Sequence, residues 1–498
     1  MKTKILKIII FPAIFIVLLL PGCKKFLEID PQGKLTQQDF PINASDALLA
    51  TNATYTTLRE WYYNSGGYPI LDIMSDDARK GSNAGDQQNN VGPYDSFRHT
   101  SSQDGLSRWW NTIYLGVKRC NVVIEFVPNI QMNQGLRERY IAEAKFVRGL
   151  LYFDLVKAWG GVPLVTTTDP KPKLPRSTAE EIYQQIIQDL TNAIAVLPEK
   201  SQYSADDAGR ASKGSAKALL AKVYLFRHNF PDAETLLMEV INSNEYSLEP
   251  IFINANGVDG NNGVESVFEI GAMQVEGTES GGDQYANTQG VRGTPNRGWG
   301  FNRPTENLRG SFEVGDPRLK GTIIDLGDTL DGILIVGDPS TPDVTKDDNG
   351  NIIEVECYNR KVWVPGNNTI TEWGLHRRIL RYADVLLMAA EALNENGKQA
   401  QALTYLNMVR ERARQGNNSI LSDITTTDQT LLSDTIMLER RHELAMEGGC
   451  RLFDLIRTGR AATVLGPLGF VAGKHELLPI PQNEIDISQG TLTQNPNW

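Results

Sequence analysis

The chain has 498 residues and a formal net charge of −11 at pH 7, with 60 acidic side chains against 49 lysines and arginines. Phosphate backbones are bound by basic surfaces, so an acidic chain without a basic stretch argues against a nucleic-acid partner. This length allows two or three average domains, or one helical repeat unit that carries inserted loops.

The first 22 residues have the composition of an export signal. Basic residues precede an apolar run from Ile8 to Leu20, which is shorter than the about 20 residues of a membrane-spanning helix. The sequence Leu-Pro-Gly-Cys that follows resembles the lipobox of bacterial lipoproteins, although Pro21 departs from the usual small or β-branched residue. We therefore expect Cys23 to carry acyl chains such as palmitate and to anchor the chain to a membrane. The alternative is an ordinary secreted protein with a chance cysteine.

The remaining cysteines are Cys120, Cys357 and Cys450. They are scattered and lack the spacing of a metal site, so they allow at most one disulfide. We expect buried, unreactive thiols.

Helical periodicity begins at about residues 45–61 and returns at Trp109, after a loop-rich region over residues 62–103. Trp109 and Trp110 are interpreted as core residues. A long helix over residues 137–164 ends at a pair of glycines, and a second over residues 182–197 has Ser177 or Thr178 as its N-cap. These two helices form one predicted hairpin.

Two further hairpins follow the same pattern. One pairs residues 216–226 with 233–241, and the other pairs two helices within residues 381–413 around the turn Asn394–Gly397. Helix resumes at residues 431–447. With the N-terminal helices, the sequence predicts an all-α dominated fold of four tetratricopeptide-like pairs, over about residues 40–241 and 373–498.

Residues 242–372 have a different composition, rich in Gly, Asn and Asp. We predict an insertion of loops and small hairpins, with strands at Val267–Ile270, Gly332–Val336 and Lys361–Val364. Asp347, Asn349 and Glu356 lie around Gly350 with offsets like those of a calcium loop, but Thr345 replaces the first aspartate and flanking helices are missing. A hairpin turn is favoured, and no metal or other cofactor is expected.

Catalytic patterns are not evident. Cleavage of a glycan needs two carboxylates across a cleft, whereas the side chains of the adjacent pairs Asp76–Asp77 and Glu180–Glu181 diverge. The histidines lack metal-site spacing, and a GxSxG elbow is not found. We expect a binding protein and not an enzyme, with a pure protein-binding scaffold as another alternative.

Two loop regions combine aromatic rings with amides and charges, as a binding site for a hydroxyl-rich ligand would. The first contains Asp76, Asp77, Arg79, Asn89, Asn90, Tyr94 and Phe97, and the second contains Asp283, Gln284, Tyr285, Asn287, Arg292, Asn296, Arg297, Trp299 and Phe301. Trp299 is the strongest candidate, because Gly298 and Gly300 leave its ring uncovered. The alternative is a tryptophan that anchors the insertion to the helical body.

Several long stretches together resemble the SusD/RagB family of surface lipoproteins from Gram-negative Bacteroidota. They include Cys23–Glu28, AKFVRGLLYFDLVKAWGGVPL, PRSTAEEIYQQIIQDL, GRASKGSAKALLAKVYL, RPTENL to DPR, RYADVLLMAAEAL, ERRHELAMEGGCRLFDLIRTGR and LLPIPQNEI. The resemblance implies one SusD-like domain over residues 23–498, held at the outer membrane and exposed at the cell surface. It also implies a glycan ligand, or a peptide in some members, and a SusC-like TonB-dependent transporter on which the protein sits as a lid.

Overall fold

The computed structural model describes residues 40–64, 68–171, 173–273, 283–342, 344–346, 350, 352–366 and 374–498. Cys23 and most of the calcium-like loop, including Asp347 and Asn349, lie outside these residues. Within the described ranges, no helix is both long enough and apolar enough to cross a membrane.

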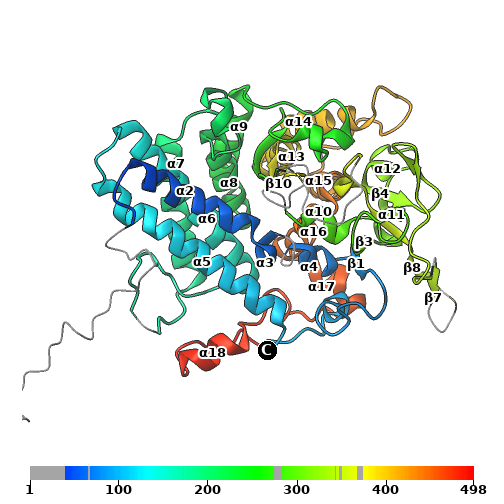
Figure 1. The fold of residues 1–498 in the computed structure, drawn as a ribbon. Helices are drawn as coiled ribbons and strands as arrows, with labels where there is room; N and C mark the ends of the chain where they lie inside the picture. Colours follow the sequence, from blue (N-terminus) through cyan, green and yellow to red (C-terminus); the bar gives the residue numbers. More distant parts are fainter. Residues whose placement is uncertain are drawn as a thin grey trace, which may run out of the picture.

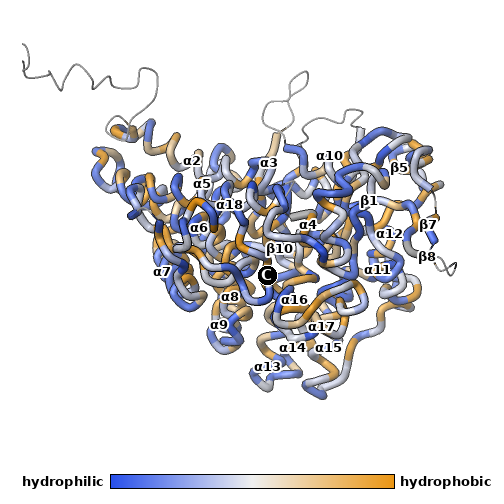
Figure 2. Tube along the Cα trace, turned by 90° about the horizontal axis from the view of Figure 1, so that it is seen from below, coloured by the Kyte–Doolittle hydropathy of each residue, from blue (hydrophilic) through white to orange (hydrophobic). Residues whose placement is uncertain are grey.

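Long helices packed in pairs form most of the molecule (Figure 1). The pairs are α2 (Ala44–Arg59) with α5 (Asp104–Phe126), α6 (Gln134–Trp159) with α7 (Ala179–Val196), α8 (Lys213–Phe226) with α9 (Phe230–Asn242), and α13 (Tyr382–Glu395) with α14 (Gln399–Ala413). The four predicted tetratricopeptide-like pairs are confirmed. Figure 2 shows apolar and polar residues alternating along these helices, as expected for elements that bury one face.

Local chemistry sets where these helices begin and end. The Thr178 hydroxyl accepts the Glu181 N–H at 3.2 Å, and the Glu181 carboxylate accepts the Thr178 N–H at 2.7 Å, so both groups at the start of α7 are satisfied. Helix α6 ends at Trp159 and not at residue 164, because Gly160 takes a φ of 71°. A Cβ on Gly161 would also lie 2.3 Å from the Ser177 oxygen, so the chain passes too close there for another helical turn.

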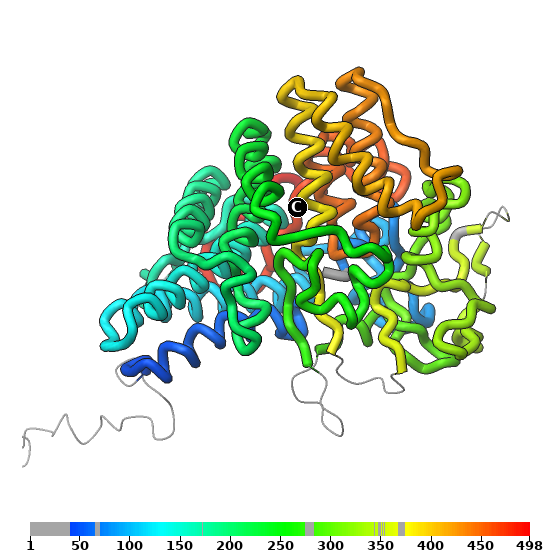
Figure 3. Tube along the Cα trace, turned by 90° about the horizontal axis from the view of Figure 1, so that it is seen from above, coloured from blue at the N-terminus to red at the C-terminus, as the bar shows by residue number. Residues whose placement is uncertain are grey.

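Helix α13 joins parts of the chain that are distant in sequence. It packs against α9 and α15 (Gln429–Leu444) as well as its partner α14. Ala389 and Ala390 are fully buried, which allows this close packing. Although residues 243–381 intervene, α9 and α13 lie side by side, so the series of pairs continues (Figure 3). The insertion therefore projects from a continuous helical body.

Among the described residues, the strands form small antiparallel two-stranded sheets. The pairs are β1 (Ala78–Gly81) with β3 (Phe301–Pro304), β2 (Ser266–Ile270) with β10 (Arg377–Arg381), β4 (Ile323–Asp325) with β9 (Cys357–Asn359), β5 (Thr329–Leu330) with β6 (Ile333–Leu334), and β7 (Val344–Lys346) with β8 (Ile352–Val355). The predicted strand Lys361–Val364 is wrong. The Asn359 side chain accepts the Lys361 N–H at 3.0 Å and starts a 3₁₀ turn over Arg360–Val362.

The remaining α-helices of the described chain are short. They are α3 (Trp61–Asn64), α4 (Tyr68–Ile73), α10 (Tyr285–Gln289), α11 (Glu306–Ser311), α12 (Arg318–Thr322), α16 (Cys450–Arg457), α17 (Ala461–Leu465) and α18 (Gln482–Ser488). The helix predicted at residues 431–447 ends earlier, at Leu444, where Ala445 becomes extended.

The insertion is joined to the helical body by a buried group of charges, which we call the Glu443 cluster. Its members are Glu265, Arg318, Arg381, Arg412, Glu439, Glu443 and Glu447, all of them buried or nearly so. Arg381 Nη1, at the end of β10, lies 2.6 Å from Glu265 and 2.5 Å from Glu443, and thus joins the residue before β2 to α15. Because each carboxylate contacts at least one guanidinium, the charges compensate one another away from water.

The end of the chain returns to the first helices. Trp159 Nε1 donates to the Pro479 oxygen at 3.0 Å, and the Asn495 amide donates to the oxygens of Trp159 and Leu478 at 3.1 and 2.7 Å. Helix α18 packs beside α5. The C-terminal segment, residues 478–498, therefore covers the N-terminal pairs.

The three described cysteines are free thiols, so the one disulfide that the sequence allowed does not form among them. Cys120 and Cys357 are buried as expected, whereas Cys450 is partly exposed. Burial raises the pKa of Cys357 to about 12. Although the residue Cys450 keeps some exposed surface, desolvation of its thiol raises the pKa to about 11, so both thiols stay protonated and weakly nucleophilic.

Candidate functional site

Strands β1 and β3 bring the two predicted loop regions together. Arg79 pairs with Arg303 and Gly81 with Phe301, and the Ser82 N–H donates to the Gly300 oxygen at 2.6 Å. Residues near 80 and residues near 300 therefore form one wall of the molecule. The sequence predicts binding residues in both segments, but its local patterns do not indicate that these segments pair.

Two partly exposed tryptophans lie against each other on this wall. The ring centroids of Trp61 and Trp299 are 5.5 Å apart, and their planes are inclined by 59°. Trp61 begins the short helix α3, directly after α2. Together the rings offer an apolar surface of the kind that packs against the C–H face of a sugar.

The glycines beside Trp299 act through the backbone. The Trp299 N–H donates to the Asn287 oxygen at 2.9 Å, and a Cβ on Gly298 would lie 2.4 Å from that same oxygen. Gly300 has a φ of 72°, in the left-handed region that glycine tolerates. The backbone at Gly298 passes close to α10, and only glycine fits there. This close approach, and not only the exposure of the Trp299 ring, explains the Gly-Trp-Gly sequence.

Polar groups stand at the edge of the same wall. Arg292 Nε lies 2.6 Å from Asp338, and its Nη1 donates to the Ser82 hydroxyl at 2.9 Å and also pairs with Asp86. Two carboxylates compensate this guanidinium, which keeps 30% of its side-chain surface exposed. Such groups can hydrogen-bond a hydroxyl-rich ligand without giving the wall a strong net charge.

Phe301 and Arg79 also reach the surface in part. The Lys80 ammonium lies 5.8 Å from the centroid of the Phe301 ring and donates to the oxygens of Gly81, Asn83 and Asp86 at 2.9 to 3.0 Å. Arg79 makes a long hydrogen bond of 3.4 Å to the Asp95 oxygen. Lys80 thus holds the loop that follows β1 in place behind these two residues.

Asp76 and Asp77 lie in the interior. Asp76 accepts from Arg451 Nε at 2.8 Å, and Asp77 accepts from Arg441 Nε at 2.7 Å. Burial raises the pKa of Asp76, but hydrogen bonding to Arg451 and the charge of Arg441 outweigh it and leave the pKa lowered. For Asp77 burial prevails and the pKa is raised. Both carboxylates tie the start of β1 to α15 and α16, so we leave them out of the proposed site.

Several predicted aromatic and amide residues are also buried. Tyr94 stacks on His99 with centroids 4.9 Å apart, and Phe97 meets the edge of Phe470 at 5.3 Å. Tyr285 and Asn287, on α10, are buried beneath the wall. These residues support the loops from the inside. Trp299, Phe301, Arg292 and Arg79 reach the surface in part, and the predicted amides Asn89, Asn90 and Asn296 are exposed.

Two of the histidines, distant in sequence, lie close together beside Tyr94. The rings of His99 and His475 are 5.8 Å apart, and both pack against Trp498 at the chain end. Burial lowers the pKa of His99 to about 3 and that of His475 to about 4. Both rings are therefore neutral at pH 7, and they pack as core aromatic groups.

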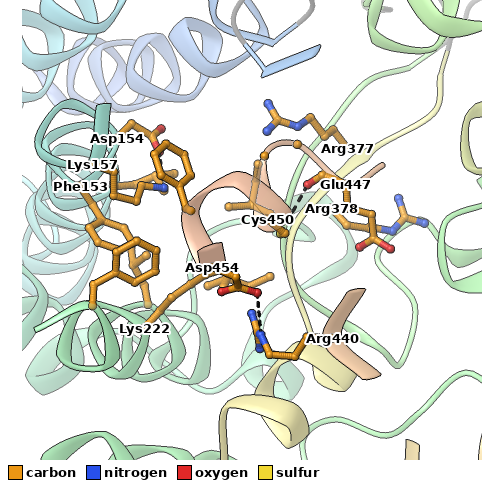
Figure 4. Close-up of a pocket in the computed structure, with 18 residues that line it drawn as sticks. Phe153, Asp154, Lys157, Lys222, Arg377, Arg378, Arg440, Glu447, Cys450 and Asp454 are labelled. Carbon is orange, nitrogen blue, oxygen red and sulfur yellow. Dashed lines mark hydrogen bonds and ion pairs between the residues drawn. The ribbon is translucent and has the colours of Figure 1, made fainter. Parts of the chain in front are cut away.

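Figure 4 shows a small cavity between α6, α8, β10 and α16. Its volume is about 50 Å³, and charged side chains in ion pairs line it. Lys157 Nζ lies 3.0 Å from Asp154 and 4.4 Å from the Phe153 ring centroid, while Arg440 Nε pairs with Asp454 at 2.9 Å. The space suits water and is too small for a sugar, so this cavity is not the candidate site.

Within the described ranges, no group of three or more His, Cys, Asp or Glu side chains could hold a metal ion. The groups that reach the surface on the wall are the rings of Trp61, Trp299 and Phe301 and the guanidinium groups of Arg79 and Arg292. The arrangement can stack and hydrogen-bond a ligand.

Known proteins resemble this chain over most of its length. A family model described as "Starch-binding associating with outer membrane" matches residues 25–225, and one described as "SusD family" matches residues 264–470. SusD-like protein P2 of Formosa agariphila is 29% identical over 513 aligned residues, which cover 97% of this chain and 99% of the relative.

Solved structures have the same fold. A laminarin binding SusD-like protein superposes with a TM-score of 0.76 at 28% identity, covering 92% of this chain and 100% of the other. Surface glycan-binding protein A from Bacteroides thetaiotaomicron, in complex with laminarihexaose, has a TM-score of 0.76 at 26% identity and covers 91% of this chain and 99% of its own.

Proposed function

Because the chain belongs to the SusD/RagB family, we propose that it is a cell-surface lipoprotein that binds an oligosaccharide or polysaccharide and delivers it to a TonB-dependent transporter of the outer membrane. The observation that carries the binding step is the partly exposed pair Trp61 and Trp299 on the wall formed by β1 and β3. The proposal includes no catalytic step, since the adjacent carboxylates Asp76 and Asp77 face arginines in the interior.

Sugar chemistry agrees with this wall. A pyranose presents flat C–H faces and many hydroxyls, which aromatic rings and nearby polar groups bind together. Two inclined rings suit a chain whose successive units are rotated against each other, because each ring can follow a different unit. One similar structure is titled as laminarin binding and another contains laminarihexaose, which supports a glucan as the first ligand class to test.

Replacing Trp299 by alanine should weaken glycan binding about 30-fold, or about 2 kcal/mol, as for other aromatic hot spots. The reason is the loss of half of the stacking surface, including its contact with Trp61. Calorimetry with laminarihexaose, preceded by a panel of glycans and peptides, measures the effect.

Leu431→Ala is the matched control, because Leu431 is a large apolar residue that is 58% exposed on α15, outside this wall. It should leave affinity unchanged. Unchanged affinity of Trp299→Ala would remove Trp299 from the site, and a lowered melting temperature would favour the structural role that the sequence also allowed.

Membrane attachment is proposed to occur through Cys23. Replacing Cys23 by alanine should move the protein from the outer-membrane fraction to the soluble fraction, because two or more acyl chains provide the anchoring free energy. Fractionation in high salt, in cells that lack the transporter, measures this directly. Cys120→Ala is the control, since that thiol is buried in the described core. A Cys23 variant that still sedimented with membranes would contradict acylation.

A further inference from the structure

We infer that an open cleft beside helix α2 is a second, polar subsite for the same glycan, so that the ligand runs from the tryptophan pair along α2. This inference rests on the proposed function and extends it to the length of the ligand. The α2 cleft consists of two adjoining depressions of about 240 and 150 Å³. Both are lined by Ala208, Gly209, Arg210, Asn262 and Glu269, so they adjoin at these residues.

The α2 cleft begins close to the tryptophan pair. Arg59 lines the cleft and is the last residue of α2, while Trp61 is the first residue of α3 (Figure 1). Two residues of chain span at most about 7 Å, so the backbones of these residues are close. A ligand that stacks on Trp61 therefore has the cleft within reach of its next units.

Electrostatics gives the same placement. Asp283, whose carboxylate accepts from the Asn64 amide at 2.9 Å, lies on the chain that leads to α10 and so to Trp299. Burial raises the pKa of Asp283 to about 6, and the nearby charge of Arg59 opposes this rise. Arg59 lines the α2 cleft, so the cleft and the segment that supports Trp299 are neighbours.

The walls of the α2 cleft suit a hydroxyl-rich ligand. The partly exposed ring of Tyr55 supplies apolar surface, and the exposed residues Asn52 and Asn262 supply amides. Asn52 Oδ1 accepts from Arg210 Nη2 at 2.9 Å, which leaves the NH₂ group of this amide as a donor. A mixed lining of this kind is typical of small-molecule sites.

Two charged residues that line the cleft, Arg210 and Glu269, are paired with opposite charges. Arg210 pairs with Asp207 at 2.6 Å and with Glu143 at 2.9 Å, and Glu269 contacts Arg378 at 3.3 Å and also His376. A strongly charged ligand would have to compete with these partners. A neutral sugar chain only has to exchange hydrogen bonds with water, so a neutral glycan of several units is the ligand class that fits.

The test measures the affinities of oligosaccharides of different length for a variant in which a large side chain blocks the α2 cleft. Thr56 is an exposed residue on the cleft face of α2, and Thr56→Trp fills the space with a large side chain. We expect wild-type affinity for laminarin oligosaccharides of two to eight units to rise with length. In Thr56→Trp the affinity for the longest should fall about ten-fold, a change of one decade in Kd, and that for the shortest should stay the same.

Two further variants make the result specific. Asn262→Gly removes one amide and keeps the left-handed backbone, whose φ is 53°, so it should weaken only the long oligosaccharides, about three-fold. Leu49→Trp is the control, because Leu49 is exposed on the same face of α2 but seven residues earlier, about 10 Å along the helix, and does not line the cleft. It should change neither affinity.

The outcomes separate the two proposals. If Thr56→Trp and Asn262→Gly bind long oligosaccharides as the wild type does, the α2 cleft is not a subsite, while the tryptophan pair still stands. An equal loss for all lengths would also overturn the inference, because the cleft would then not act separately. If no glycan binds the wild type, or Trp299→Ala binds like it, the proposed function itself fails.

Discussion

Replacing Glu443 by glutamine should lower the free energy of unfolding by about 3 to 5 kcal/mol, the cost of removing one partner from a buried ion pair. Glu443 is completely buried, and its carboxylate contacts Arg381 at 2.5 Å, Arg318 at 3.2 Å and also Arg412. Glutamine keeps the shape but removes the charge that compensates three guanidinium groups. Urea unfolding at pH 7 measures the loss.

The pH dependence of stability has a defined direction at this residue. Burial raises the pKa of Glu443, but the charges of Arg412, Arg381 and Arg318 lower it by more, so the pKa lies well below its usual range. A carboxylate with a depressed pKa in the folded state stabilises the protein above its unfolded pKa. The wild type should therefore lose this stabilisation as the pH falls below about 4.5, and Glu443→Gln should lack this component of the acid dependence.

Asp423→Asn is the matched control for Glu443→Gln. Asp423 pairs with Arg414, but 58% of its side chain is exposed, so water screens the pair. The expected loss is below about 1 kcal/mol. Equal losses in the two variants would contradict the view that burial gives the Glu443 cluster its importance.

Replacing Trp159 by alanine should also destabilise the protein, by about 3 to 5 kcal/mol, as for other large-to-small changes in a core. The ring of Trp159 is fully buried between Trp109, at 4.9 Å, and Trp110, at 5.2 Å. Its Nε1 also donates to the Pro479 oxygen. The variant loses both the packing of α5 on α6 and a contact to the C-terminal segment.

Trp159→Phe is the control for Trp159→Ala, because it keeps an aromatic ring and loses the hydrogen bond. A smaller loss of about 1 to 2 kcal/mol is expected. Thermal unfolding gives the stabilities, and limited proteolysis should show earlier cleavage within residues 478–498 in the alanine variant. Similar stabilities of the two variants would mean that the packing between α5 and α6 adjusts to the missing ring.

The helical pairs could be predicted because their signals are local. A spacing of apolar residues by three and four positions, a capping threonine at Thr178 and a turn glycine at Gly397 all lie within the element that they define. The strand predicted at Lys361–Val364 is wrong for a local reason as well, since its short run of apolar residues says nothing of the Asn359 cap.

The pairing of β1 with β3 could not be predicted in this way. Ala78–Gly81 is four residues long and has a lysine and an arginine at its centre, so it lacks the alternation of a half-buried strand. Its partner lies far away in the sequence, and only the folded helical body brings the two together. The sequence therefore predicts two separate loop regions in place of one wall.

Composition located the wall but did not tell which side chains face outward. Asp76, Tyr94 and Asn287 have the residue types of a binding site, yet each is buried, because loops of this size need their own polar and aromatic core. The sequence does not single out Trp61 as a binding residue, because Trp61 stands at the end of the predicted helix over residues 45–61 and fits that helical pattern. The run of aromatic residues at positions 61–63 was the available signal.

The course of the C-terminal segment has a consequence for biosynthesis. A chain that leaves the ribosome with its N-terminus first exposes α5 and α6 long before residues 478–498 exist. The indole rings of Trp109, Trp110 and Trp159 then lack part of their cover during synthesis, and apolar surface of this kind is what general chaperones hold. The N-terminal helical pairs therefore reach their final packing only after residues 478–498 have been translated and have docked on them.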